Sequence, residues 1–120
     1  MRFAIVVLVA MLAGCGGLTD GRIRDVPATT YSSAHSVDEV LSCLKPTLDG
    51  LGGWADVTTY PTTGRVEVDI SAEQGFKKRD FYLITLLPSQ TGSAAEIRSA
   101  GDNHGRISER ELIDKVKSCV

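Results

Sequence analysis

The side chains best suited to covalent chemistry in this sequence are the thiols of its three cysteines, at positions 15, 43 and 119. A thiol can be alkylated to a thioether, can pair with a second thiol, or can bind a metal ion. Cys15 closes an apolar run near the start of the chain, whereas Cys43 and Cys119 lie in later segments with helical patterns. The first cysteine therefore needs a different explanation from the other two.

The apolar run before Cys15 is typical of a secretory leader. Arg2 supplies a positive charge, and an apolar stretch of 11 residues follows from Phe3 to Ala13. As a helix this stretch would span roughly 16 Å, about half of the ~30 Å hydrocarbon core of a bilayer. It is too short for a stable membrane span, so we interpret residues 1–14 as a signal peptide.

The tetrapeptide Leu12-Ala13-Gly14-Cys15 resembles the lipobox of bacterial lipoproteins at all four positions. The resemblance implies that the sulfur of Cys15 is diacylated, that the leader is removed, and that Cys15 becomes the acylated N-terminus in the bilayer. Two or three acyl chains anchor a protein stably, whereas a single chain does so only marginally. Gly16 replaces the Asp of the inner-membrane retention signal, which implies an outer-membrane, periplasm-facing location in a Gram-negative host. The alternative is a coincidental cysteine in an uncleaved anchor.

Composition limits the remaining chain to one small domain with no strong electrostatic field. The chain has 120 residues, is 42% hydrophobic and carries a net charge of −2. Such a charge does not favour nucleic acid as a partner. Residues 15–35 show no sustained periodicity, and we expect a lipidated N-terminus and flexible tether with a reach of about 25 Å. Within it, residues 23–26 could dock as an edge strand.

The segment from 36 to 120 predicts two helices that enclose four strands. Ser36 and Ser108 each open a capping box, with Glu39 and Glu111 three residues later. Pro46 is expected to kink or end the first helix near position 45. The apolar residues at helical spacing are Val37, Val40, Leu41, Leu44 and Leu48 in the first helix, and Leu112, Ile113, Val116 and Val120 in the last.

Four β-prone segments lie between the two helices, at 54–60, 65–71, 80–88 and 93–99. Val66, Val68 and Ile70 alternate with polar residues, which indicates a strand with one buried face. The short turns between the segments favour an antiparallel sheet. We therefore expect a single α+β domain in the order α-β-β-β-β-α, with both helices packed on one face of the sheet.

The segment 80–88 is apolar on both of its strand faces. One face carries Phe81, Leu83 and Leu87, and the other carries Tyr82, Ile84 and Leu86. If the two helices cover only one face of the sheet, the second apolar face needs a partner. We expect Tyr82, Ile84 and Leu86 to form this candidate contact with another envelope protein.

Cys43 and Cys119 are expected to form a disulfide bond. Cys43 lies three residues after Val40, and Cys119 three after Val116, so each continues the apolar face of its helix. Helices packed side by side could bring the two thiols within bridging distance, and an exported domain meets an oxidising compartment. Two buried free thiols, or one thiol used between chains, remain the alternatives.

Residues with catalytic or metal-binding chemistry are few. Asp102, His104 and Ser108 could compose a hydrolytic triad on paper, but no nucleophile elbow accompanies them. The 102–105 segment lacks the later Glu of a calcium loop, and His104 with Glu111 or Asp114 gives too few zinc ligands. The basic run 77–79 is interpreted as protection of a strand edge, with a contact to headgroups or glycan phosphates as the alternative. We expect no enzyme activity, no metal and no cofactor.

The domain also resembles a loose group of small bacterial lipoproteins. The resemblance rests on the segments 40–44 (Val-Leu-Ser-Cys-Leu), 91–93 (Thr-Gly-Ser) and 116–119 (Val-Lys-Ser-Cys). It implies a fold rather than an activity. Together these patterns lead to a membrane-anchored, periplasm-facing lipoprotein that acts as a non-catalytic binding or scaffolding module. The alternative is a periplasmic inhibitor or ligand-capturing protein that uses a loop such as 102–106.

Overall fold

The computed structural model describes residues 16–120, so the predictions on the leader and on Cys15 lie outside the described residues. Two 3-10 helices and two α-helices accompany five strands. The elements are η1 (Arg22–Asp25), β1 (Thr29–Ser33), α1 (Val37–Leu51), η2 (Gly52–Trp54), β2 (Ala55–Tyr60), β3 (Arg65–Gln74), β4 (Lys77–Ser89), β5 (Gly92–Ser99) and α2 (Glu109–Cys119).

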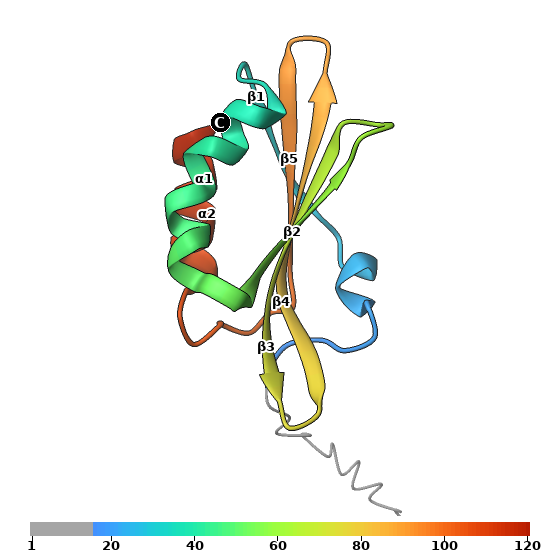
Figure 1. The fold of residues 1–120 in the computed structure, drawn as a ribbon, viewed down its shortest axis with the longest axis vertical. Helices are drawn as coiled ribbons and strands as arrows, with labels where there is room; N and C mark the ends of the chain where they lie inside the picture. The colour runs from blue at the N-terminus through green and yellow to red at the C-terminus, as the bar shows by residue number, and fades with distance from the viewer. Residues whose placement is uncertain (1–15) are drawn as a thin grey trace, which may run out of the picture.

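The five strands form one antiparallel sheet in the order β1-β5-β4-β3-β2. Both α-helices lie on the same face of this sheet, while η1 lies on the opposite face (Figure 1). The predicted α+β class, the antiparallel pairing and the placement of both helices on one face are confirmed.

The alternating pattern of β3 determines which sheet face becomes the core. Val66, Val68 and Ile70 are buried towards the helices, and Val68 pairs with Ile84 of β4 in the ladder. Because side chains opposite one another share a face, this register also turns the even-numbered apolar residues of β4 towards α1 and α2. Glu67 and Asp69 project from the other face.

Each helix begins at its predicted cap. The Ser36 hydroxyl accepts the Glu39 N–H at 3.2 Å, and the Ser108 hydroxyl accepts the Glu111 N–H at 3.1 Å. The prediction that Pro46 kinks or ends the first helix is wrong with respect to its end, because α1 continues to Leu51. Pro46 removes one N–H bond, but Pro46 and Ser42 are both exposed, so water can satisfy the freed carbonyl of Ser42.

The segment expected to be a flexible tether is largely folded onto the domain. β1 pairs with β5 at one edge of the sheet, from Thr29 opposite Ile97 to Ser33 opposite Ser93. The expected edge strand at 23–26 is instead η1, whose Ile23 is buried against the sheet face that the helices leave open. A short strand of Thr, Tyr and Ser lacks hydrophobic alternation, so periodicity could not reveal β1.

The predicted partner contact at Tyr82, Ile84 and Leu86 is wrong. All three side chains are fully buried in the core beneath α1 and α2. The sequence showed two apolar faces on this strand, and only the pairing with β3 decided which face the helices cover. The open face of β4 therefore carries Leu83, Thr85 and Leu87.

Candidate functional site

The chain directly after Cys15 is hydrogen-bonded to β4 near the start of that strand. Leu18 and Asp80 exchange both backbone hydrogen bonds, with N···O distances of 2.9 and 2.7 Å. The Gly17 N–H also donates to the Asp102 carboxylate at 3.2 Å. Gly17 has a φ of +90°, and a Cβ there would stand 3.0 Å from the Cβ of Arg79, so glycine suits this close passage. The attachment leaves two residues, Gly16 and Gly17, between Cys15 and Leu18.

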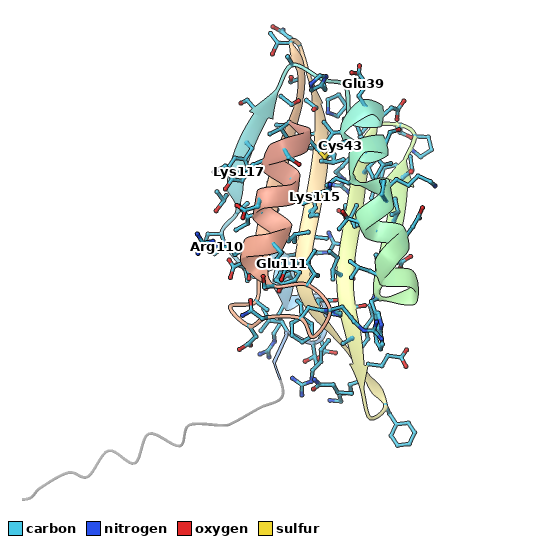
Figure 2. The ribbon with its side chains drawn as sticks, turned by 90° about the vertical axis from the view of Figure 1, so that its left-hand side faces the viewer. Glu39, Cys43, Arg110, Glu111, Lys115 and Lys117 are labelled. Carbon is cyan, nitrogen blue, oxygen red and sulfur yellow. A yellow bond between two sulfur atoms is a disulfide. The ribbon has the colours of Figure 1, made fainter. Side chains whose placement is uncertain are left out.

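The two helix cysteines form the predicted disulfide. The sulfur atoms of Cys43 and Cys119 are bonded, and the two Cα atoms are 5.6 Å apart. Cys43 faces α2 from the neighbouring helix (Figure 2). The bridge joins α1 to α2 across a sequence separation of 76 residues, which confirms the predicted pairing.

His104 lies in the loop before α2, and its side chain is buried, with only 6% of the residue exposed. Its Nε2 lies 2.9 Å from the Ser71 carbonyl oxygen, and its Nδ1 lies 3.0 Å from the Arg106 backbone nitrogen. Because a carbonyl only accepts and an amide N–H only donates, Nε2 carries the proton and Nδ1 accepts. Both ring nitrogens are therefore used to hold the loop before α2 against β3.

The hydroxyl of Tyr82 completes this buried polar cluster. It donates to the Ile107 carbonyl at 2.8 Å and accepts the His104 N–H at 2.9 Å. Burial raises the pKa of the Tyr82 phenol, so the group stays protonated and can make both bonds. The His104 ring also packs edge-on against Phe81, with 5.2 Å between ring centroids. These contacts give His104 and Tyr82 a structural role.

The residues considered for a triad or a metal site are used separately. The Asp102 carboxylate accepts the Gly17 N–H, and Ser108 caps α2, so neither bonds to a nitrogen of the His104 ring. Within residues 16–120, no group of three or more His, Cys, Asp or Glu side chains could hold a metal ion. Glu111 and Asp114, which were considered beside His104 as zinc ligands, belong to no such group in this part of the chain.

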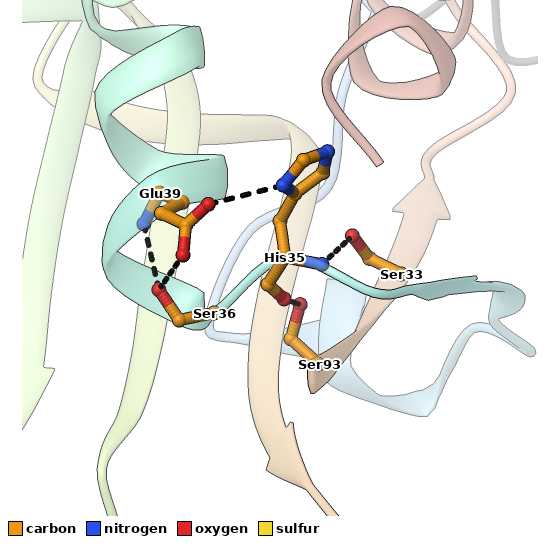
Figure 3. A network of polar contacts seen from close by, with 5 residues as sticks. All are labelled: Ser33, His35, Ser36, Glu39 and Ser93. Atoms are coloured by element: carbon orange, nitrogen blue, oxygen red, sulfur yellow. Dashed lines mark hydrogen bonds and ion pairs between the residues drawn. The ribbon is translucent and has the colours of Figure 1, made fainter. Parts of the chain in front are cut away.

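A second set of Ser, His and Glu side chains lies at the start of α1 (Figure 3). His35 Nδ1 is 3.0 Å from one oxygen of Glu39, and the Ser36 hydroxyl donates to the other oxygen at 3.2 Å. These bonds lower the pKa of Glu39, the His35 bond contributing most. A nucleophilic serine must donate to the imidazole, whereas Ser36 donates to the carboxylate. The set is a helix cap with an added histidine.

Charged side chains cover the sheet face opposite the α-helices. Arg24 of η1 makes two bonds to the Glu67 carboxylate, at 2.8 and 2.6 Å, and these bonds lower the pKa of Glu67. Beside them is a hollow of about 260 Å³ with residues of both charges in its lining. Its lining residues are Arg24, Arg65, Glu67, Leu83, Thr85, Leu87, Glu96 and Arg98. The sequence showed alternate charges on β3, but not that Arg24 would reach them.

The carboxyl groups of Asp69 in β3 and Asp80 in β4 lie close together. Burial raises the pKa of Asp80 to about 6, and the hydrogen bond and charge of Asp69 act in the same direction. Lys78 lies 3.1 Å from the second oxygen of Asp69 and partly compensates the negative charge. When Asp80 is protonated, it can donate a hydrogen bond to the Asp69 carboxylate.

The edge strand β2 is only partly covered, and four of its six residues are exposed. All six of its residues pair with β3 on one side, and β2 is the last strand of the sheet on the other. Val57 points to the helix side, opposite Val68, yet 44% of it is exposed. A hollow of about 350 Å³ lies between β2 and α1. It is lined by Leu41, Ser42, Lys45, Leu48, Asp49 and Val57.

Comparison of the chain with protein-family models, with curated proteins and with solved structures gave no significant match. None of the helices in residues 16–120 is long and apolar enough to cross a membrane. The features of the chain that bear on its function are therefore the tetrapeptide at 12–15 and the surfaces described above.

Proposed function

We propose that this protein is a lipid-anchored component of the bacterial cell envelope, facing the periplasm, and that its domain is a non-catalytic binding module. The observation that carries the proposal is the lipobox-like Leu12-Ala13-Gly14-Cys15, followed three positions later by Leu18, whose backbone is bonded to the domain. A thiol acylated at Cys15 would hold the domain against the membrane surface. The favoured location is the outer membrane.

Mass spectrometry of the protein made in a bacterial host tests the anchor. Wild-type protein should lack residues 1–14 and carry the mass of two or three acyl chains, and it should fractionate with membranes. Cys15→Ser should abolish both the added mass and the cleavage before position 15. The matched control is Cys43→Ser, which removes a different thiol and should leave acylation intact. Wild-type protein without acyl mass would refute the anchor.

The binding surface that the geometry favours is the edge strand β2 with the hollow beside it. An extended segment of a partner protein can add to the free side of β2 through backbone hydrogen bonds. Its side chains on the helix side would then cover Val57 and fill the hollow bordered by Leu41 and Leu48. β2 contains no lysine or proline that would discourage such pairing.

Site-specific photo-crosslinking in intact cells tests this surface. A photoreactive residue in place of Thr59, on the same face of β2 as Val57, should give one dominant adduct with an envelope protein. Val57→Lys should remove that adduct, because an ammonium group would enter an apolar contact. Thr91→Lys, in the exposed turn between β4 and β5, is the control and should retain it. An adduct that survives Val57→Lys would place the partner elsewhere.

The alternative of a ligand-capturing loop at 102–106 is less well supported. His104 of that loop is buried, and the Asn103 side chain accepts the Glu109 N–H at 3.0 Å. A loop whose side chains are bonded inward offers few groups to a ligand. The same bonding of both His104 nitrogens supports a non-catalytic domain.

A further inference from the structure

The hairpin between β3 and β4 ends in an exposed aromatic residue. Gln74 is the last residue of β3 and Lys77 the first of β4, and Gly75 and Phe76 form the turn. The side chain of Phe76 is fully exposed, and it is the most exposed large hydrophobic residue in the described part of the chain. A phenyl ring extended into water at a hairpin tip indicates a contact that covers it.

Positive charge accompanies this aromatic residue. Residues 73–79 contain Lys77, Lys78 and Arg79 against the single acid Glu73, a net charge of +2 in a chain whose total is −2. Lys78 pairs with Asp69 at 3.1 Å, whereas Lys77 is exposed directly beside Phe76. Aromatic rings sit at the headgroup level of bilayers, and nearby cations are attracted to anionic lipids.

The chain that leads to Cys15 reaches the same end of the molecule. Residues 19–21 and 76–78, together with Asp80, line one hollow of about 440 Å³. The start of the described chain lies beside the β3–β4 hairpin in Figure 1. Leu18 lies three positions after Cys15, a span of at most about 11 Å. Asp80, the partner of Leu18, likewise lies three positions after Lys77, a distance of about 10 Å along a strand.

We propose that the hairpin tip is a second membrane contact, in which Phe76 enters the interface of an anionic bilayer and Lys77 binds headgroup phosphates. The proposal rests on the anchoring function proposed above for its orientation, because a lipid on Cys15 would hold the tip at the bilayer surface. Anchor and tip together would fix how the domain stands on the membrane. The turn between β4 and β5 would then lie far from the lipid, at the other end of the sheet (Figure 1).

Fluorescence on vesicles tests the contact with the mature chain, residues 15–120. Trp54→Phe removes the native indole, and Phe76→Trp then places a reporter at the tip, with Val57→Trp as the matched control on exposed β2. The thiol of Cys15 is coupled to a maleimide lipid in vesicles of phosphatidylethanolamine and phosphatidylglycerol. Cys43 and Cys119 do not react while their disulfide is intact.

The Phe76→Trp indole should shift its emission to shorter wavelengths and be quenched by lipids brominated in the acyl chains, and the Val57→Trp indole should show neither effect. Lys77→Gln, or phosphatidylcholine in place of phosphatidylglycerol, should reduce the shift. Emission from Phe76→Trp that stays as in water would overturn the proposal. A shift seen only in native envelope fractions would also overturn it, in favour of a protein contact.

The coupling chemistry separates this proposal from the anchoring function. The maleimide lipid supplies the attachment at Cys15 whether or not a cell acylates that residue. Failure of the natural acylation would appear as missing acyl mass, while the vesicle experiment would still decide on Phe76. An exposed indole on coupled protein would refute the hairpin contact and leave the lipidation of Cys15 as it stands.

Discussion

At the scale of single residues, the chain places several polar groups where water cannot satisfy them and supplies protein partners instead. Four hydrogen bonds of His104 and Tyr82 fix the loop before α2 and hold it against β3 and β4. Removing one partner of such a set leaves a buried donor or acceptor unpaired. Asp69 and Asp80 are among the exceptions, because each has one carboxyl oxygen that is buried without a hydrogen-bond partner.

Asp80→Asn should stabilise the domain at neutral pH. The pKa of Asp80 is raised to about 6 in the folded protein. Its protonated form therefore favours folding, an advantage that is complete below the unfolded pKa near 3.8 and is lost as the pH rises through about 6. At pH 7.5 an amide that cannot ionise should raise the free energy of unfolding by about 1 kcal/mol, allowing for solvent screening.

Urea denaturation at pH 4 and at pH 7.5 measures this effect. The gain from Asp80→Asn should be present at pH 7.5 and small at pH 4. Asp114→Asn, at an exposed position of α2, is the control and should change stability little at either pH. A variant that is less stable than wild type at pH 7.5 would show that the ionised carboxylate supports the fold.

At the scale of elements, the short helix η1 is fixed to the sheet by very few contacts. It contributes one buried side chain, Ile23, and one bidentate ion pair between Arg24 and Glu67. The Glu67 side chain is nearly buried while that of Arg24 is about half exposed, so the arginine supplies the partner that the buried carboxylate needs. η1 also holds the preceding chain against the open face of the sheet.

Arg24→Met should weaken η1 and its neighbour β1. The bond from Arg24 lowers the pKa of Glu67, so this pair contributes stability above the unfolded pKa of the carboxyl, near 4.5, and loses it as the pH falls through the folded value. We expect a loss of about 1 kcal/mol at pH 7. Hydrogen exchange should quicken in residues 22–33. The control is Arg22→Met in the same turn, and equal exchange in both variants would argue against the pair.

At the scale of the whole molecule, the sheet collects segments from both ends of the sequence. β1 and the closing helix α2 lie far apart in the chain. β1 pairs with β5, and α2 packs against β5 and against α1, to which the disulfide links it. Such long-range connections carry a large loop-closure entropy, which a covalent link reduces in the unfolded chain. The disulfide between α1 and α2 is that link.

Replacing both helix cysteines by alanine should strongly destabilise the domain. By the loop-entropy model, a bridge across 76 residues contributes about 4 kcal/mol. The comparison is made in a Cys15→Ser background, by urea denaturation with and without a reductant. Reductant should lower the unfolding midpoint of the bridged protein and leave the alanine variant unchanged. Equal midpoints for the two proteins would contradict a stabilising role of the bridge.

The sequence by itself determined the features that depend on near neighbours in the chain. Capping boxes, the alternation in β3 and the apolar faces of both helices predicted the α+β class and the cysteine pairing, because each follows from local periodicity. The lipidation of Cys15 stays a prediction from a local motif. Tertiary structure decided which apolar face of β4 is covered, since only the register with β3 distinguishes Tyr82 from Leu83. It also decided the course of residues 18–33, whose bonds to β4 and β5 join positions at least 60 residues apart and leave no periodic signal.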